Sequence, residues 1–125
     1  MFRVIIAGSR SFDDYELLVR KMDMLLQNIT DEIAVVCGEA RGADTLGKRY
    51  ALERGYRVLS YPADWDTYGK RAGYMRNITM AENADALVAF WDGESRGTKH
   101  MIDIARQYGL STRIIRYEQY KEINK

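Results

Sequence analysis

Residues 86–108 read ALVAFWDGESRGTKHMIDIARQY, and this stretch decides the fold. The apolar run Ala86–Phe90 is typical of a strand that is buried on both faces. From Lys99 to Tyr108 the apolar residues recur at helical spacing. A loop that contains two glycines, Trp91–Thr98, joins the two segments. The stretch therefore predicts a strand, a tight loop and the start of a helix.

A strand–loop–helix junction of this kind suits a phosphate group. Free backbone N–H groups and the positive end of the helix dipole point at one spot. Gly93 and Gly97 let a ligand approach the backbone, Thr98 adds a hydroxyl, and Lys99 follows with a charge. We therefore predict these four residues as ligand-binding. Taken alone, the stretch fits equally well an ordinary βα turn in which the glycines only permit tight geometry.

The same alternation of strand and helix continues along the rest of the chain. The other predicted strands are Arg3–Ala7, Ile33–Cys37, Tyr56–Ser60 and Thr112–Tyr117. The other predicted helices run from a cap at Ser11 or Asp13 to about Asn28, from about Ala43 to Gly55, and from about Lys70 to Glu82. We expect a polar, aromatic loop at Tyr61–Tyr68 and a charged tail at Glu118–Lys125.

Five strands alternating with four helices predict an α/β fold with right-handed crossovers. We expect a single three-layer, Rossmann-like domain over residues 1–125, with a parallel sheet in the order 3-2-1-4-5 and helices on both faces. In such sheets a ligand lies outside the carboxyl ends of the strands, where the strand order reverses. The loops Gly8–Ser11 and Trp91–Thr98 would face each other there, with Gly38–Asp44 one strand away.

Composition narrows the classes of partner. The chain has 19 basic and 18 acidic residues, so no basic excess indicates a nucleic acid or an anionic membrane, although a local basic patch is compatible with these totals. No apolar run approaches the roughly 18 residues of a membrane span. With no signal peptide in the sequence, we expect a cytoplasmic protein that does not bind membranes.

The single cysteine and the single histidine exclude two kinds of site. Cys37 lies in an apolar strand, so there is no disulfide scaffold, and a buried, inert thiol is favoured over a reactive one. Cys37 and His100 cannot make a usual zinc site, and we predict neither a metal nor a cofactor. We expect His100 to lie on the surface near a helix start, with a ligand contact as the alternative.

Arginine occurs in each of the three glycine-bearing loops, as Arg10, Arg41 and Arg96. Its planar guanidinium donates two parallel hydrogen bonds and so suits phosphate. A solvent-facing role is the simpler interpretation of any one of them, but three on converging loops favour an anion site. Arg76 and Asn77, on the third predicted helix, could reach the same crevice, and Arg76 could equally be solvated.

Carboxylates and aromatic residues could serve the rest of a nucleotide. Asp92 and Glu94 lie in the central loop and could hold sugar hydroxyls or act as a general base, whereas Asp44 is better explained as a helix cap. Aromatic side chains could stack on a base or only cover the sheet edge: Tyr61, Trp65, Tyr68 and Trp91.

Four motifs together resemble those of a known superfamily. They are Gly8-Ser9-Arg10, the run CGEARGAD at residues 37–44, Met75-Arg76-Asn77 and Gly97-Thr98, in this order. The chain resembles the SLOG superfamily, a Rossmann-like group that contains the DNA-processing protein A (Smf) domain and the Lonely-guy phosphoribohydrolases. It is most similar to the stand-alone YspA/YpsA-like branch, which is often of bacterial or phage origin.

This resemblance implies a nucleotide or nucleotide-derived ligand, with its phosphate on the helix start at Gly97-Thr98. By carry-over and from the loop positions, the remaining ligand-binding residues would be Gly8, Ser9, Arg10, Gly38, Arg41, Arg76 and Asn77. One departure concerns the reaction. The phosphoribohydrolases have a glutamate three residues after their Gly-Thr, and this chain has Met101 there. The resemblance therefore supports the fold and the ligand class better than the reaction.

Three functions follow from these patterns. The first is nucleotide binding by a sensor or sequestering protein. The second is an N-glycosidase that cleaves base from ribose phosphate, with Asp92, Glu94 or Glu39 in place of the missing glutamate. The third is single-stranded DNA binding, which the near-zero net charge disfavours. By analogy with the superfamily, two copies could pair through the third and fourth predicted helices.

Overall fold

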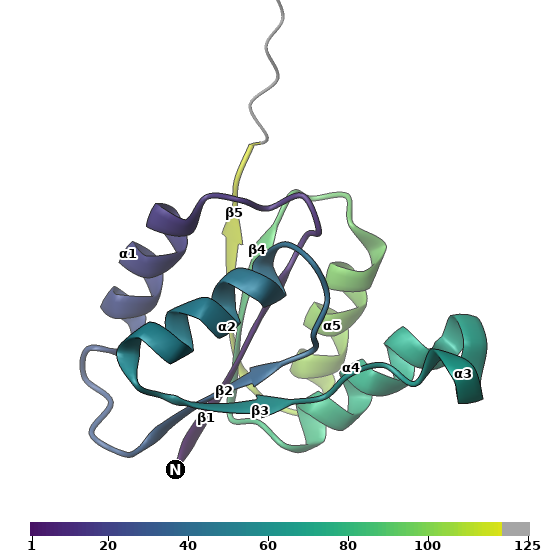
Figure 1. Cartoon of the computed structure of the whole chain (residues 1–125), viewed down its shortest axis with the longest axis horizontal. Coiled ribbons are helices and arrows are strands. Elements are labelled where there is room, and N and C mark those ends of the chain that lie inside the picture. The colour runs from purple at the N-terminus through teal and green to yellow at the C-terminus, as the bar shows by residue number, and fades with distance from the viewer. Residues whose placement is uncertain (119–125) are drawn as a thin grey trace, which may run out of the picture.

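Five parallel strands form one sheet in the order β3-β2-β1-β4-β5, as the sequence predicts (Figure 1). This computed structural model describes residues 1–118, so the predicted tail lies outside the described residues apart from Glu118. The strands are β1 (Phe2–Gly8), β2 (Ile33–Cys37), β3 (Arg57–Ser60), β4 (Ala86–Trp91) and β5 (Ser111–Arg116).

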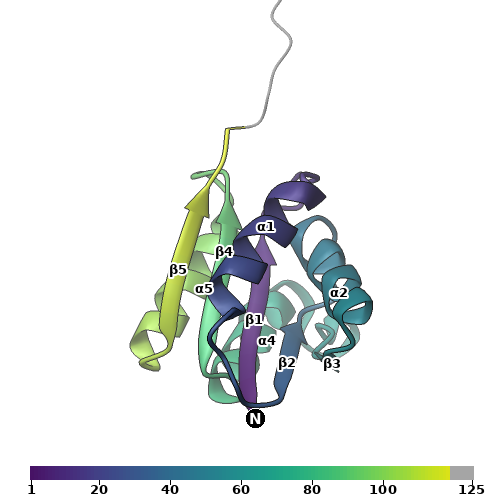
Figure 2. The ribbon, with the colours of Figure 1, turned by 90° about the vertical axis from the view of Figure 1, so that its left-hand side faces the viewer.

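Helices cover both faces of the sheet (Figures 1 and 2). They are α1 (Tyr15–Leu26), α2 (Ala43–Arg54), α3 (Trp65–Tyr68), the 3-10 turn η1 (Gly69–Arg71), α4 (Ala72–Glu82) and α5 (Arg96–Gln107). None of these helices combines the length and the apolar character needed to cross a membrane.

The core consists of two apolar clusters, one on each face of the sheet. Val4 and Ile6 of β1 pack with residues of α1 and α2 on one face. Ile5 and Ala7 pack with residues of α4 and α5 on the other. Because successive strand residues point to opposite faces, a strand covered on both sides needs an unbroken apolar run. This requirement explains why the central strands read as apolar throughout, and the predicted α/β fold class is confirmed.

Aspartate side chains cap two helices whose starts differ from the predicted ones. Asp14, not Ser11 or Asp13, caps α1: its Oδ1 accepts the Leu17 N–H at 3.0 Å. A short helix, α3, occupies part of the predicted Tyr61–Tyr68 loop, and Asp64 caps it by accepting the Thr67 N–H. These caps fit the preference of aspartate for the N-cap position.

The start of α5 matters most for function. The helix begins at Arg96, three residues earlier than the apolar periodicity indicates, and Ser95 is its N-cap. Gly97 and Thr98 therefore lie in the first helical turn rather than in the loop. The first turn of a helix is where backbone N–H groups have no intrahelical partner.

Candidate functional site

A cavity of about 500 Å³ opens at the carboxyl ends of β1 and β4, where the strand order reverses. Most of the predicted ligand-binding residues line it: Gly8, Ser9, Arg10, Arg76, Asn77, Gly97 and Thr98. Gly38 and Arg41 instead line an adjoining hollow of about 510 Å³, which shares Arg10, Trp65 and Arg76 with the cavity. Gly93 and Lys99 line neither.

Ser9 and Gly8 fix the relative positions of the segments that line the cavity. The Ser9 N–H donates to the Phe90 carbonyl at 3.0 Å, and its hydroxyl oxygen accepts the Asp92 N–H at 3.1 Å. Its carbonyl accepts the Ala43 N–H as well, so one residue that is 2% exposed links β1, β4 and α2. A Cβ at Gly8 would lie 2.1 Å from the Phe90 carbonyl oxygen, so only glycine fits there. Both residues thus position the loops.

Asp92 shapes the loop that precedes α5. Its Oδ1 accepts the backbone N–H groups of Glu94 and Ser95, each at 2.9 Å. Burial opposes ionisation of Asp92, but these bonds and the Ser9 hydroxyl hold its pKa below the ordinary value. Asp92 lines the cavity as an ionised acceptor, whereas Glu94 is exposed and does not line it. The ionised, hydrogen-bonded Asp92 does not suit proton transfer at neutral pH, and Glu94 does not reach the cavity.

Gly93 and Lys99 have contacts of their own. Gly93 has φ +88°, which favours glycine, and a Cβ there would lie 2.5 Å from Arg116 Nη2. The Lys99 ammonium pairs with Asp103 at 2.9 Å on the exposed side of α5. The positive φ of Gly93 and the ion pair of Lys99 therefore account for these two residue types without a bound ligand.

The first turn of α5 faces the cavity. The Ser95 hydroxyl accepts the Thr98 N–H at 3.4 Å, and Thr98 is 4% exposed. Gly97 lines the cavity, and a Cβ added to it would meet no atom of the protein within 4 Å. Unlike Gly8, Gly97 is therefore not required by packing within the protein.

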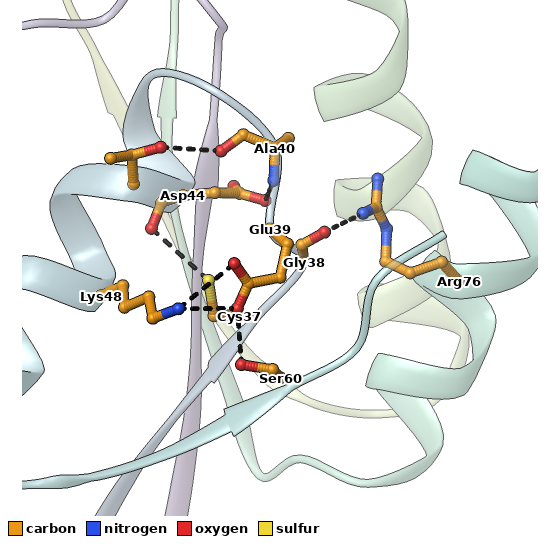
Figure 3. Close-up of polar contacts among 9 residues, drawn as sticks. Cys37, Gly38, Glu39, Ala40, Asp44, Lys48, Ser60 and Arg76 are labelled. Carbon is orange, nitrogen blue, oxygen red and sulfur yellow. Dashed lines mark hydrogen bonds and ion pairs between the residues drawn. The ribbon is translucent and has the colours of Figure 1, made fainter. Parts of the chain in front are cut away.

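Arg76 is a half-buried cation whose hydrogen-bond partners are neutral, and Figure 3 shows the partner at Gly38. Its Nη1 donates to the Gly38 carbonyl oxygen, and its Nε donates to Asn77 Oδ1 at 3.1 Å. Burial lowers the pKa of the guanidinium from its ordinary value, and the nearby Asp44 carboxylate opposes this shift without cancelling it. Of the cationic side chains that line the cavity, Arg10, Lys70 and Arg76, none forms an ion pair within residues 1–118.

Asp44 is the functional candidate that sequence reasoning missed. It was predicted to cap α2, and that prediction is wrong: Gly42 occupies the N-cap position, and Asp44 lies in the first turn. Its Oδ2 accepts the Ala40 N–H at 3.2 Å, and the residue is 5% exposed at the cavity floor. Burial raises its pKa to about 6. A carboxyl of this pKa can take up or release a proton near neutrality.

The Gly38 position brings Arg76 and Asp44 close together. A Cβ there would lie 2.8 Å from both Arg76 Nη1 and Asp44 Oδ2. The neighbouring Cys37 is buried, as predicted, and burial raises the pKa of its thiol to about 11.

Glu39 is held away from the cavity (Figure 3). Its carboxylate accepts the Ser60 hydroxyl at 2.5 Å and pairs with Lys48 at 3.3 Å. The Ser60 bond is the main reason that its pKa is lowered. Its φ of +63° is unusual for a residue other than glycine, and it lies in the wall of the adjoining hollow. The carboxylate is thus ionised and already paired.

Two aromatic side chains line the mouth of the cavity, Trp65 and Tyr74, which are 52% and 47% exposed. Trp65 was a stacking candidate from the sequence, but Tyr74 was not. Trp91 has a structural role instead, since its Nε1 donates to the Ser95 carbonyl at 3.1 Å. Tyr61 packs on the core, and Tyr68 lies outside the cavity lining.

Two further predicted residues lie differently from expectation. Arg96 is exposed and does not line the cavity. His100 is half-buried rather than on the open surface: its Nδ1 lies 3.0 Å from Asn77 Nδ2, and its ring contacts Tyr74.

Comparison with known proteins places this chain in a family. The profile described as "YspA, cpYpsA-related SLOG family" matches residues 2–68. The Gene 61 protein of Mycobacterium phage D29 is 37% identical over 116 residues, which cover 88% of this chain and 93% of that protein.

Two solved structures share the fold. DNA processing protein A from Streptococcus pneumoniae has a TM-score of 0.69 at 17% identity, over 90% of this chain and 49% of that one. This chain thus spans about half of that protein's length. The protein TM1055 has a TM-score of 0.65 at 20% identity, over 90% of this chain and 72% of its own. The profile match and the phage relative show that the chain belongs to the YspA, cpYpsA-related SLOG family.

Proposed function

We propose that this protein binds a nucleotide or nucleotide-derived ligand, with a phosphate group at the start of α5, and acts as a sensor or sequestering protein. The observation that carries the proposal is Arg76, a desolvated guanidinium that lines the same cavity as Gly97 and Thr98. Removing a charge from water is costly unless an opposite charge compensates it. The Asp44 carboxylate compensates the charge of Arg76 only in part, since the two form no ion pair and burial still lowers the pKa of the guanidinium, and a bound phosphate would supply the rest.

Gly97 supports the same position for the anion. A helix start offers backbone N–H groups and a positive dipole end to an anion. At Gly97 a side chain would meet no protein atom, so the protein itself does not demand a glycine there. A phosphate that approaches the Gly97 amide closely would favour a glycine, because a side chain there would take up part of the same space.

Other residues that line the cavity suit the base and the negative charge of a nucleotide. Trp65 and Tyr74 offer exposed aromatic surface at the mouth, on which a base could stack. Arg10 and Lys70 add positive charge without ion pairs of their own within residues 1–118. Membership of a SLOG family supports a nucleotide-related function, and we infer that residues 1–125 work as one such domain.

Calorimetric titration tests the proposal. The probes are AMP, ADP-ribose and cyclic AMP, added to wild type and to Arg76→Ala. We expect at least one probe to bind wild type, with an affinity about tenfold or more weaker for Arg76→Ala. Arg106→Ala is the matched control, because Arg106 is an exposed arginine at the far end of α5. Absence of binding by every probe at millimolar concentration would refute the proposal.

Asp44 favours one second candidate, an N-glycosidase. The cavity contains a carboxyl whose pKa is raised to about 6, as a general acid or base requires. In this case Asp44, rather than Asp92, Glu94 or Glu39, would transfer the proton during cleavage of base from ribose phosphate. Chromatography of a nucleotide panel should show free base with wild type and none with Asp44→Asn. A panel that yields no base with wild type eliminates this candidate for those substrates.

A further inference from the structure

Asn77 connects Arg76 to His100 by hydrogen bonds. Arg76 and Asn77 lie on α4, and His100 lies on α5. Asn77 Oδ1 accepts the Arg76 Nε–H at 3.1 Å. On its other side, Asn77 Nδ2 lies 3.0 Å from His100 Nδ1 and 3.4 Å from the Gly97 carbonyl oxygen. One amide therefore touches the guanidinium, the histidine and the first turn of α5.

The chemistry of these groups fixes the orientation of the amide and the protonation of the histidine. A guanidinium only donates, so the amide atom that faces Arg76 Nε must be the oxygen. The NH₂ group then faces His100, whose Nδ1 must accept. His100 is therefore neutral in this arrangement, with its proton on Nε2. Asn77 is 5% exposed, so water cannot easily replace either partner.

A proton on His100 Nδ1 would make two donors face each other. Rotation of the amide would relieve this contact, but it would turn the NH₂ group toward the Arg76 Nε–H, which also only donates. The alternative is displacement of the histidine ring from its place beside Tyr74, where the ring centroids are 4.4 Å apart. Either response removes a hydrogen bond from a buried network.

We propose that Asn77 and His100 are positioning residues for Arg76, and that His100 must be uncharged for the cavity to hold its anion well. The inference rests on the proposed anion site and adds its regulation: ligand affinity falls when His100 gains a proton. Neither residue needs to touch the reacting or binding atoms of a ligand for this effect.

The surroundings of His100 support a neutral ring. Burial lowers its pKa, and the Asp103 carboxylate on the same helix opposes this shift. Asp103 is itself paired with Lys99. From α4, the groups that face His100 are the Tyr74 ring and the Asn77 amide. Within residues 1–118, Asp103 is the charged group that acts on the ring.

The first experiment needs no ligand. His100 is the single histidine of the chain, so its ring proton resonance reports one titration without overlap. We expect a pKa below 6.5 in wild type, a higher pKa in Asn77→Ala, and an Arg76 Nε–H resonance that shifts with the same midpoint. An Arg76 resonance that does not follow the titration of His100 would overturn the inference, whatever ligands the protein binds.

The second experiment measures affinity against pH. The probe is ADP-ribose, because its phosphates stay fully ionised between about pH 5 and pH 8, and sulfate serves as a simpler anion for the same reason. Wild type should bind ADP-ribose about tenfold more weakly at about pH 5 than at about pH 8. His100→Asn is the conservative variant: its amide oxygen can accept from Asn77 but cannot gain a proton. We expect it to retain the affinity at high pH and to lose the pH dependence.

The direction in which a bound anion shifts the pKa of His100 distinguishes this inference from a purely Coulombic effect. If protonation weakens binding through Asn77, linkage requires that the bound anion lower the pKa of His100. A nearby anion that acted only by Coulomb attraction would raise that pKa. A raised pKa, or a His100→Asn variant with the pH dependence of wild type, contradicts the inference. If neither probe binds at any pH, and AMP and cyclic AMP do not bind either, the proposed function fails, and the ligand-free titration still decides whether Arg76 and His100 are coupled.

Discussion

Substitution of Gly97 by alanine should separate folding from binding in one experiment. Gly97 is the second residue of α5, and a Cβ there meets no protein atom within 4 Å. Alanine loses less conformational entropy than glycine on entering a helix, by about 0.5–1 kcal/mol. For a chain of this size, the melting temperature should rise by about 2–4 °C.

Binding should respond in the opposite direction. The new methyl group would occupy cavity space beside the Gly97 and Thr98 amides, where we place the phosphate. An anion displaced from these donors loses about one charge-assisted hydrogen bond, which amounts to about 1.5–3 kcal/mol, or at least tenfold in affinity.

Thermal unfolding and calorimetry on the same samples measure both effects. Thr79→Ala is the matched control, because it also places alanine in a helix but on the exposed side of α4, outside the cavity. We expect it to stabilise the protein slightly and to leave binding unchanged. A Gly97→Ala protein that is more stable and binds as well as wild type would refute the placement of the phosphate. A Gly97→Ala protein that is less stable than wild type would refute the inference that the added methyl group meets no protein atom.

Three further predictions concern the same loops. Gly8→Ala should destabilise the fold by about 3 kcal/mol or more in urea unfolding, because its Cβ would lie 2.1 Å from the Phe90 carbonyl oxygen; a near-neutral result contradicts the close approach. Asp44 has its pKa raised from 3.8 to about 6 by burial, so the folded state holds this proton more tightly than the unfolded state, and its contribution to stability falls as pH rises through that window. The gain in unfolding free energy from Asp44→Asn should therefore grow by about 2 kcal/mol between pH 4 and pH 7.5, whereas a gain independent of pH contradicts the raised pKa. Fluorescence anisotropy with a labelled single-stranded oligonucleotide should show weak binding at most, even at low salt, given the net charge of +1; tight binding would revive the DNA-binding alternative.

The fold could be predicted because its determinants are local and repetitive. The apolar runs of β1, β2 and β4 predict strands covered on both faces, and the helical spacing of apolar residues between the strands predicts helices. The predicted strand order is the one common in Rossmann-like sheets with right-handed crossovers. The capping residues could not be predicted as well, because several aspartates and serines near each helix start compete for one position, as Asp13 and Asp14 do.

The site was only partly accessible from the sequence. The motifs led to Arg10, Arg76, Asn77, Gly97 and Thr98, and the structure brings these five residues to one cavity. Motifs do not reveal which polar atoms already form hydrogen bonds within the protein.

Four residues illustrate this limit. Ser9 and Asp92 lie in the predicted loops, yet their hydrogen bonds serve the loops. Asp44 owes its raised pKa to burial, and His100 owes its position to contacts with Tyr74 and Asn77 of α4, which are distant in sequence. No local pattern carries that information.

The most direct measurement of the central claim is a nitrogen–proton NMR titration of the protein with AMP. The account predicts saturable shifts of the Gly97 and Thr98 backbone amides and of the Arg76 Nε–H, all with one dissociation constant. A different outcome would contradict it: shifts that leave these three groups unmoved and gather instead on the basic groove between α1 and β5, which Arg20, Lys21, Arg113 and Arg116 line.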